Sequence, residues 1–461
     1  MIENKVISKV EILDNKEKSM FNRFIAFEKP FFESEFRMFI DIYKQCNEQE
    51  IFKTLFPKRK YSNVYLRFFY KELNKLVDSF FSFLEQKKDP RKQHIYGIQF
   101  LKAKGAWKNL ETEQKKFSKN ISQQKKSKQL IYELLMFEEI RHLSASEVDR
   151  RNDNYLLSLE EKIDEYYWYE KLKINCDKII RSQVFNVQYS YDFLDHSLNF
   201  IPPHYLENNV LIKAYYLIFV LFKKDSEEDF RIVLELLNTN INKIEHEELK
   251  DLYACLQNYC IRKANSGHAI YLNYLFEIYD QLIKHRIIFH NNVLNIFDYK
   301  NIATLGIRLK EFEWVKTFTE EYTSFLPKEY RSSATAFNLA RILFFEKKYK
   351  EAIQKLQHVS FADVYYEVGA RTLLVKIYYE QDDWIILDTI ITSFKVYLNR
   401  NKRLSELVKN NTLNFLKYTA HLIKNSSQSK LEKSYHLVKN NKSLLERDWL
   451  LAKYKNVLQK N

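Results

Sequence analysis

Residues 336–356 read AFNLARILFFEKKYKEAIQKL, an apolar helical run followed by a short charged turn and a second amphipathic helix. Leu339 in this stretch has counterparts at Leu305 and Leu374, which gives intervals of 34 and 35 residues. A period in this range, filled by two helical patterns and a tight turn, is typical of stacked helix-turn-helix repeats. Because such a unit cannot bury its apolar face alone, the pattern predicts that neighbouring units stack on one another.

The composition predicts an all-α protein. The chain has 461 residues but only 5 Gly and 6 Pro, residues that sheet proteins and doubly wound α/β folds need at turns and phosphate loops. Aromatic residues make up 16% of the chain and can fill the broad seams between stacked helices. The hydrophobic fraction of 46% is ample for a core, which argues against general disorder.

The opening stretch resembles the tetratricopeptide repeat. In that family a large apolar residue precedes a small one in the first helix. An aromatic residue begins the second helix, and a small residue follows three positions later, where the two helices cross closely. Leu339, Ala340, Tyr349 and Ala352 occupy these positions. The resemblance implies an α-α superhelix, that is, a helical solenoid.

The two flanking units match the family less closely. The preceding unit keeps Leu305, the small residue Gly306 and Trp314, whereas the following one has Val375 and Leu387 at the two small positions. The clearest repeats therefore span about residues 299–395. The chain as a whole also resembles a kind of bacterial protein with a helical N-terminal region before such repeats, a resemblance that implies no function.

The pattern along the chain predicts three regions: a helical bundle at 1–90, a basic region of long helices at 91–200, and a repeat region at 201–461. Two consecutive prolines at 202 and 203 cannot continue a helix, and they mark the main boundary. Long helices are predicted, among others, at 95–110, 115–139 and 429–458.

Positive charge is concentrated in two segments. Residues 85–128 carry 13 Lys or Arg against 4 acids, and residues 395–461 carry 15 against 4. These segments sum to +20 whereas the whole chain carries +14, so the remaining residues carry −6. Lysine runs of this kind are most often solvated helix faces. They can also contact nucleic-acid phosphates, an acidic protein or a membrane surface. The residues nominated as anion or nucleic-acid contacts are Lys58, Arg59, Lys60, Lys115, Lys116, Lys125 and Lys126.

The repeat region favours a binding function without chemistry. A solenoid offers a long concave surface, made by the first helix of each repeat, on which a peptide or protein partner can lie. The outward residues of these helices are predicted to be Phe337, Asn338 and Arg341 in one unit and Arg371 and Lys376 in the next. Of these, the residues predicted to contact the partner are Asn338, Arg341, Arg371 and Lys376. By contrast, Leu339, Leu343 and Tyr349 are assigned to the core.

The sequence carries no motif for catalysis, a cofactor or a metal. The glycine patterns that cradle phosphates or present a nucleophile do not occur, and no HExxH or CxxC pair is present. We therefore expect no enzymatic activity unless a pocket gathers ionisable side chains from distant positions.

Several features predict a cytoplasmic protein without a membrane span. Cys46, Cys176, Cys255 and Cys260 are expected to be ordinary thiols in a reducing compartment. The N-terminal residues lack the apolar segment of a secretory signal. The most apolar run, 210–222, is interrupted by a lysine and is too short to cross a bilayer.

Overall fold

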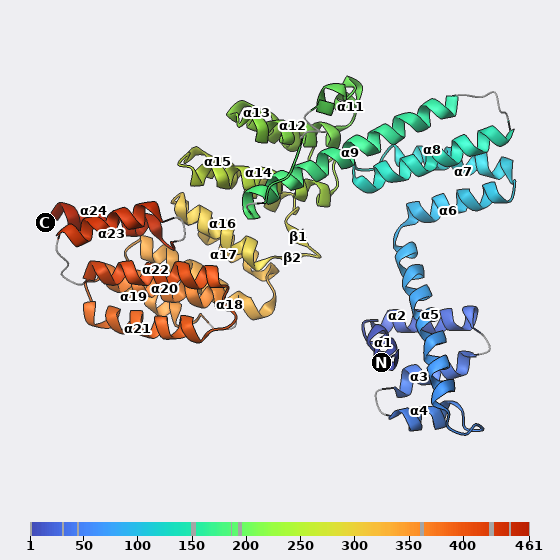
Figure 1. Cartoon of the computed structure of the whole chain (residues 1–461), viewed down its shortest axis with the longest axis horizontal. Coiled ribbons are helices and arrows are strands. Elements are labelled where there is room, and N and C mark those ends of the chain that lie inside the picture. The colour runs from blue at the N-terminus through green and yellow to red at the C-terminus, as the bar shows by residue number, and fades with distance from the viewer. Residues whose placement is uncertain are drawn as a thin grey trace. The chain divides into compact units, whose positions relative to one another are not determined.

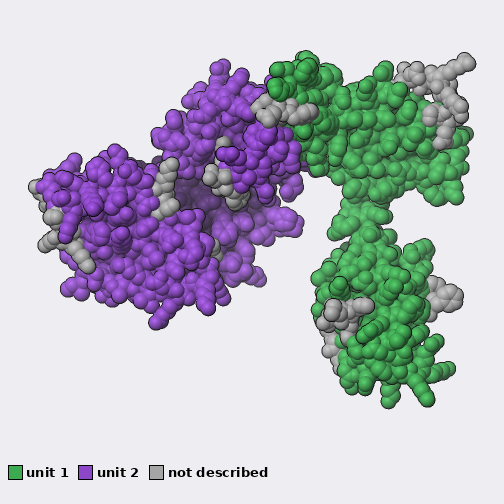
Figure 2. Space-filling view, viewed as in Figure 1, with its two compact units in different colours: residues 1–173, 192–213 green, residues 174–191, 214–461 purple. Residues whose placement is uncertain are grey.

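The computed structural model confirms the all-α class (Figure 1). It describes residues 2–29, 32–43, 46–148, 154–185, 187–191, 196–359, 364–423, 428–441 and 444–460. Within these residues the strands are confined to one two-stranded hairpin, β1 (Phe289–His290) with β2 (Val293–Leu294). The chain forms two compact units, Met1–Lys173 with Asp192–Lys213, and Ile174–Tyr191 with Ala214–Asn461 (Figure 2). The prolines at 202 and 203 lie within the second stretch of the first unit.

The first unit begins with five helices: α1 (Ile2–Glu11), α2 (Asn15–Glu28), α3 (Glu33–Ile42), α4 (Glu48–Leu55) and α5 (Asn63–Lys88). Local signals set several of their starts: Asp14 and Asn47 form capping boxes with the glutamates three residues later, and the Ser62 side chain caps α5. The long helix α5 packs against α1 and α2. Buried aromatic rings join the helices, such as Phe36 on Phe69 with ring centroids 5.0 Å apart.

The next helices are α6 (Pro90–Ala103), α7 (Trp107–Ile121), α8 (Lys128–Val148) and α9 (Asn154–Phe185). Two sequence predictions are wrong here, because one helix was expected at 95–110 and another at 115–139. Gly105 ends the first of them early: its backbone is left-handed, with φ +64°, and a tight turn follows. Helices α6 to α8 share a hydrophobic core of their own, and Phe117 packs on Phe137 there with ring centroids 4.6 Å apart.

Further helices lead into the repeat region: η2 (Leu198–Phe200), α11 (Pro203–Asn208), α12 (Val210–Lys224), α13 (Glu227–Asn240), α14 (His246–Asn265) and α15 (Ile270–Lys284). Among the described residues, no helix is long and apolar enough to cross a membrane. The segment with the greatest apolar density, α12, is instead a core helix whose residues Leu211, Tyr215 and Phe219 are buried.

The second unit continues as helical hairpins: α16 (Ile296–Arg308) with α17 (Phe312–Tyr322), α18 (Lys328–Phe345) with α19 (Tyr349–Leu356), α20 (Val364–Glu380) with α21 (Trp384–Arg400), and α22 (Glu406–Ile423) with α23 (Gln428–Asn440). A 3-10 turn, η3 (Thr323–Phe325), follows α17, and α24 (Arg447–Lys460) ends the described chain. The first helices of successive hairpins pack on one another, as α16 does on α18 and α18 on α20. This packing is that of a helical-repeat fold.

The same turn closes the first helix of three of these hairpins. In each, a residue with left-handed backbone follows the helix: Lys310, Lys347 and Asp382, with φ 65°, 61° and 56°. The next amide then donates to a carbonyl five residues back, as Glu311 does to Gly306 at 2.9 Å and Lys348 to Leu343 at 2.8 Å. This 6→1 bond is the Schellman arrangement, and it reverses the chain sharply between the two helices.

The predicted helix at 429–458 is wrong. Helix α23 ends at Asn440 and α24 begins at Arg447, so a break separates them. Glu446, directly before α24, has a left-handed backbone with φ 52°, which a continuous helix does not allow.

The small residue predicted at the helix crossing, Gly306, lies where α16 and α17 meet most closely. A Cβ added there would lie 2.5 Å from Cγ2 of Val315, far inside ordinary van der Waals contact. We expect Gly306→Ala to lower the free energy of unfolding by about 1–3 kcal/mol, the usual cost of overpacking. This cost exceeds the gain of about 1 kcal/mol in helix propensity.

The matched control is Gly97→Ala in α6, where an added Cβ has no atom within 4 Å. This substitution should stabilise the protein by up to about 1 kcal/mol. Denaturant unfolding followed by circular dichroism measures both effects. Adding Val315→Ala should rescue Gly306→Ala, and a stabilising Gly306→Ala would show that the two helices do not meet there.

Candidate functional site

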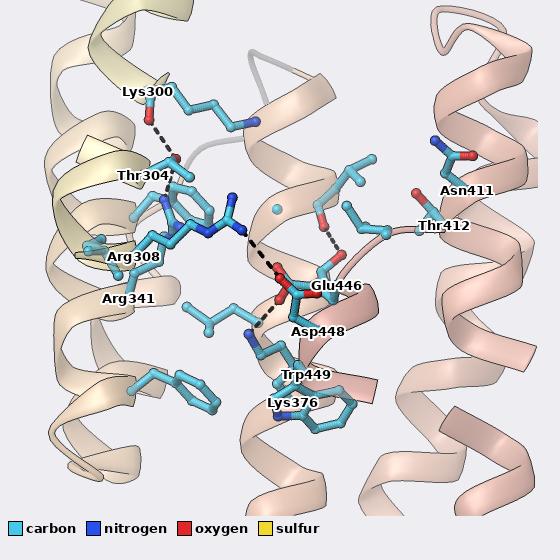
Figure 3. Close-up of a pocket in the computed structure, with 18 of the residues that line it drawn as sticks. Lys300, Thr304, Arg308, Arg341, Lys376, Asn411, Thr412, Glu446, Asp448 and Trp449 are labelled. Atoms are coloured by element: carbon cyan, nitrogen blue, oxygen red, sulfur yellow. Dashed lines mark hydrogen bonds and ion pairs between the residues drawn. The ribbon is translucent and has the colours of Figure 1, made fainter. Parts of the chain in front are cut away.

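The candidate site is a cavity of about 610 Å³ inside the second unit (Figure 3). The first helices of four successive hairpins, α16, α18, α20 and α22, form its walls. The residues that begin α24, together with those just before it, close one side. Aromatic and aliphatic side chains make up much of the lining, including Phe337, Phe344, Phe345, Leu373 and Trp449.

Three polar lining residues occupy equivalent places in successive hairpins. Arg341 on α18, Lys376 on α20 and Asn411 on α22 follow one another at intervals of 35 residues. The corresponding position on α16 is Gly306, at the helix crossing. The cavity therefore lies on the face that the repeat presents in each unit, which is the arrangement expected of a repeated binding surface.

Arg341 extends from α18 into the cavity. Its guanidinium donates a hydrogen bond of 2.7 Å to Oγ1 of Thr304, which in turn donates to the carbonyl of Lys300 at 2.6 Å (Figure 3). The surrounding protein desolvates the guanidinium and lowers its pKa, although the negative charge of Glu446 partly opposes this effect. An arginine remains protonated despite such a shift, so it presents a positive charge to the cavity.

Lys376 is the most buried cation of the cavity, with 8% of its side chain exposed. Its ammonium lies 2.8 Å from Oε2 of Glu446 and 4.8 Å from the centroid of the Phe344 ring. The rings of Phe345 and Trp449 lie at 5.9 and 5.8 Å. One carboxylate and three aromatic rings together offset the cost of removing this charge from water.

Glu446 faces the cavity from the turn before α24. Burial alone would raise its pKa, but the charge and hydrogen bond of Lys376, with the charge of Arg341, outweigh burial and lower the pKa. The carboxylate is therefore ionised at neutral pH. About a third of its side chain stays exposed, at 35%, because that surface faces the hollow of the cavity.

A second cavity, of about 1020 Å³, lies on the other side of the same turn. It extends to the end of α14 and the start of α15, and its lining includes Arg262, Arg308 and Arg447. Glu446, Asp448 and Trp449 line both cavities. Asp448 lies 3.5 Å from Arg308 across the boundary, and both side chains are largely exposed.

Helix α24 is held firmly behind this turn. Leu450 and Tyr454 are fully buried, and the Tyr454 hydroxyl donates to the carbonyl of Tyr418 at 2.9 Å. Trp449 donates from Nε1 to Glu380 at 2.9 Å and packs edge-on against Tyr379. The helix thus anchors the acidic turn at the edge of the cavity.

The structure does not bring together the four residues predicted to contact a partner. Arg341 and Lys376 both line the cavity. Arg371 lies outside its lining: it pairs with Glu367 at 2.8 Å and lies over the Tyr397 ring at 4.6 Å. Asn338 has no exposed surface and lies beside Tyr299.

The predicted faces of α18 are correct in part. Phe337 and Arg341, expected to point outward, both line the cavity, but Asn338 is buried. Leu339, Leu343 and Tyr349, expected in the core, are only half buried. A first helix inside the stack packs against its own partner helix and against the first helices on both sides. Such a helix is therefore covered on most sides. Its residues cannot be divided into one buried face and one solvent-exposed face.

The basic residues nominated for nucleic acid all lie in the first unit. Lys58, Arg59 and Lys60 form an exposed loop before α5, where Arg59 lies over the Tyr65 ring at 4.5 Å. Lys115 pairs with Glu111 at 2.6 Å and Lys116 with Glu113 at 2.7 Å, each within one helical turn. The nominated residues Lys125 and Lys126 follow α7, with Lys125 exposed and Lys126 half buried.

Sequence reasoning misses Glu446, Asp448 and Trp449, because the apolar periodicity predicts one helix at 429–458. The 35-residue interval that joins Arg341, Lys376 and Asn411 is a usable signal for α22, and the same interval continues to Glu446.

A scan against models of protein families finds no match, and searches of curated proteins and of solved structures find none either. Across the described ranges, no three His, Cys, Asp or Glu side chains gather where they could hold a metal ion. None of the four cysteines, all of them in the described ranges, forms a disulfide; Cys46 is partly exposed and the other three are buried.

Removing the Lys376 ammonium should take from Glu446 its nearest compensating charge and its ion-pair partner. We expect Lys376→Met to lower the free energy of unfolding at pH 7 by about 1–2 kcal/mol. This is below the 3–5 kcal/mol of a fully buried broken pair, because solvent screens the exposed third of Glu446. Since the folded pKa of Glu446 is lowered, its stabilising contribution is present above an unfolded pKa of about 4.3 and is lost as pH falls through the folded pKa.

The destabilisation by Lys376→Met should therefore shrink as pH falls from 7 to about 3, as followed by urea unfolding. Combining Lys376→Met with Glu446→Gln should recover most of the loss. A difference between wild type and Lys376→Met that stays constant with pH would contradict the ion pair.

Proposed function

We propose that this chain is a non-enzymatic interaction protein whose tetratricopeptide-like superhelix binds a segment of a partner protein in the cavity of the second unit. The observation that carries the proposal is the equivalent placement of Arg341, Lys376 and Asn411 on successive helices around one cavity. A repeated, concave face with aromatic walls and a few polar groups suits an extended peptide. The free thiols fit a reducing compartment such as the cytoplasm.

The ionisable groups of the cavity favour binding over catalysis. Glu446 has a lowered pKa and an arginine keeps its proton, so neither exchanges protons near neutral pH. The nearby hydroxyls of Thr372 and Thr412 donate to helix carbonyls, at 2.7 Å each, which suits a structural role. Described lining residues include neither His nor Cys.

The test is affinity capture of the intact protein from its own cells, with wild type compared against Arg341→Gln. We expect a partner to be lost with Arg341→Gln and retained with Arg400→Gln, an exposed arginine at the end of α21 outside the cavity lining. Circular dichroism should show that both variants stay folded. Equal capture by wild type and Arg341→Gln would contradict binding in the cavity.

The alternative is a nucleic-acid-binding protein that uses the basic segments 85–128 and 395–461, which carry +9 and +11. It predicts binding to random RNA or DNA with a steep dependence on salt. That binding should be lost when the charges at Lys115, Lys116, Lys125 and Lys126 are reversed, as measured by fluorescence anisotropy. Nuclease treatment during the capture separates the two functions, and absence of binding at low salt would eliminate this alternative.

A further inference from the structure

We propose that the partner segment is acidic and carries an aromatic side chain, and that its carboxylates displace those of Glu446 and Asp448 from the cations of the cavity. The inference rests on the proposed function, because it concerns the same cavity. It names the chemistry of the ligand and an internal competitor for it.

The chain's own residues 446–449 show which chemistry the cavity accepts. Glu446 binds Lys376 at 2.8 Å, and Asp448 lies 3.5 Å from Arg308. Next to them, Trp449 packs edge-on against Tyr379 with ring centroids 5.1 Å apart, and its ring lies 5.8 Å from the Lys376 ammonium. The segment thus presents an acid, a spacer, an acid and an aromatic ring to the cations and rings around it.

Cations outnumber acids around the turn. Arg308, Arg341 and Lys376 line the first cavity with the acids Glu446 and Asp448. The second cavity adds Arg447 and shares the same two acids, whereas its Arg262 pairs with Asp225 at 2.5 Å. The positive excess favours an anionic ligand, and the aromatic walls favour a peptide over a chain of phosphates.

Arg341 is the cation best placed to receive a further carboxylate. The hydrogen bond described for its guanidinium goes to the Thr304 hydroxyl, a neutral acceptor. Its remaining N–H groups can form the paired contacts that guanidinium makes with carboxylate. A carboxylate of the ligand can form a charge-assisted hydrogen bond with Arg341 without breaking any described contact.

The two internal carboxylates can leave without unfolding the helix behind them. Asp448 is 76% exposed, and both acids line the second cavity as well as the first. Glu446 has a left-handed backbone, and this conformation costs about 1 kcal/mol or more for a residue with a Cβ. The helix stays in place through the buried Leu450 and Tyr454.

The experiment measures binding of a fluorescein-labelled synthetic peptide to the full chain by anisotropy. The peptide repeats the order Glu-x-Asp-Trp, and a second peptide replaces Glu by Gln and Asp by Asn. We expect the acidic peptide to bind wild type and the neutral one to bind at least tenfold more weakly. Arg341→Gln should weaken the acidic peptide about tenfold, which corresponds to the loss of 1.4 kcal/mol.

Removal of the internal competitor should strengthen binding. Glu446→Gln with Asp448→Asn should lower the Kd of the acidic peptide about tenfold. The matched control, Glu406→Gln with Glu432→Gln, removes the same charge from exposed positions outside both cavities and should leave the Kd unchanged. Since the first pair of changes leaves Lys376 without its carboxylate, Asp448→Asn alone serves as a mild variant and should give a smaller gain in the same direction.

Each outcome tests a different part of the proposal. If the acidic peptide binds wild type but no better to the variants at 446 and 448, displacement is wrong and the proposed function stands. If the neutral peptide binds as well, acidic recognition is wrong, whereas peptide binding stands. If single-stranded RNA of the same charge binds equally and depends equally on Arg341, the cavity recognises charge and not a peptide. If neither peptide binds any form and the capture is insensitive to Arg341→Gln, the proposed function falls too.

Discussion

The burial of the Lys376 ammonium is the constraint on which the cavity of the second unit depends, because the ammonium needs a carboxylate beside it, here that of Glu446. The Glu446 contact joins α20 to the turn before α24, and the ring of Phe344 brings α18 to the same ammonium. A lysine this buried is costly unless an opposite charge and polarisable rings surround it. The three helices must therefore keep their spacing, and that spacing holds the hollow open between them.

Much of the fold follows from residues that are close in sequence. The recurrence of Leu305, Leu339 and Leu374 predicts the hairpins, and the small residue Gly306 predicts where two helices touch. Breaks within helical patterns were harder to predict. Gly105 and Glu446 interrupt what periodicity reads as continuous helices, because a single left-handed residue reverses the chain without changing the spacing of apolar residues around it.

The candidate site was predicted in part. Arg341 and Lys376 were found because the repeat places them at equivalent positions, whereas Asn338 was wrongly placed on the surface. Asn338 is polar and so reads as exposed, yet neighbouring helices cover it from more than one side. Glu446 continues the 35-residue series after Asn411, but it precedes α24 and does not lie within a first helix. Its position beside Lys376, and that of Asp448 beside Arg308, therefore depend on how the last helix folds back. The spacing of residues that are near in sequence does not predict such a long-range contact.

The turns that close the hairpins have a consequence for how this array can change. Lys310, Lys347 and Asp382 occupy left-handed positions where most helices place glycine. Each unit therefore carries a small and separate conformational strain that is unrelated to its core or its cavity. A substitution to glycine at one of these solvent-exposed turns can relieve the strain and stabilise one unit at a time. The residues that line the cavity can meanwhile change independently to suit different partners.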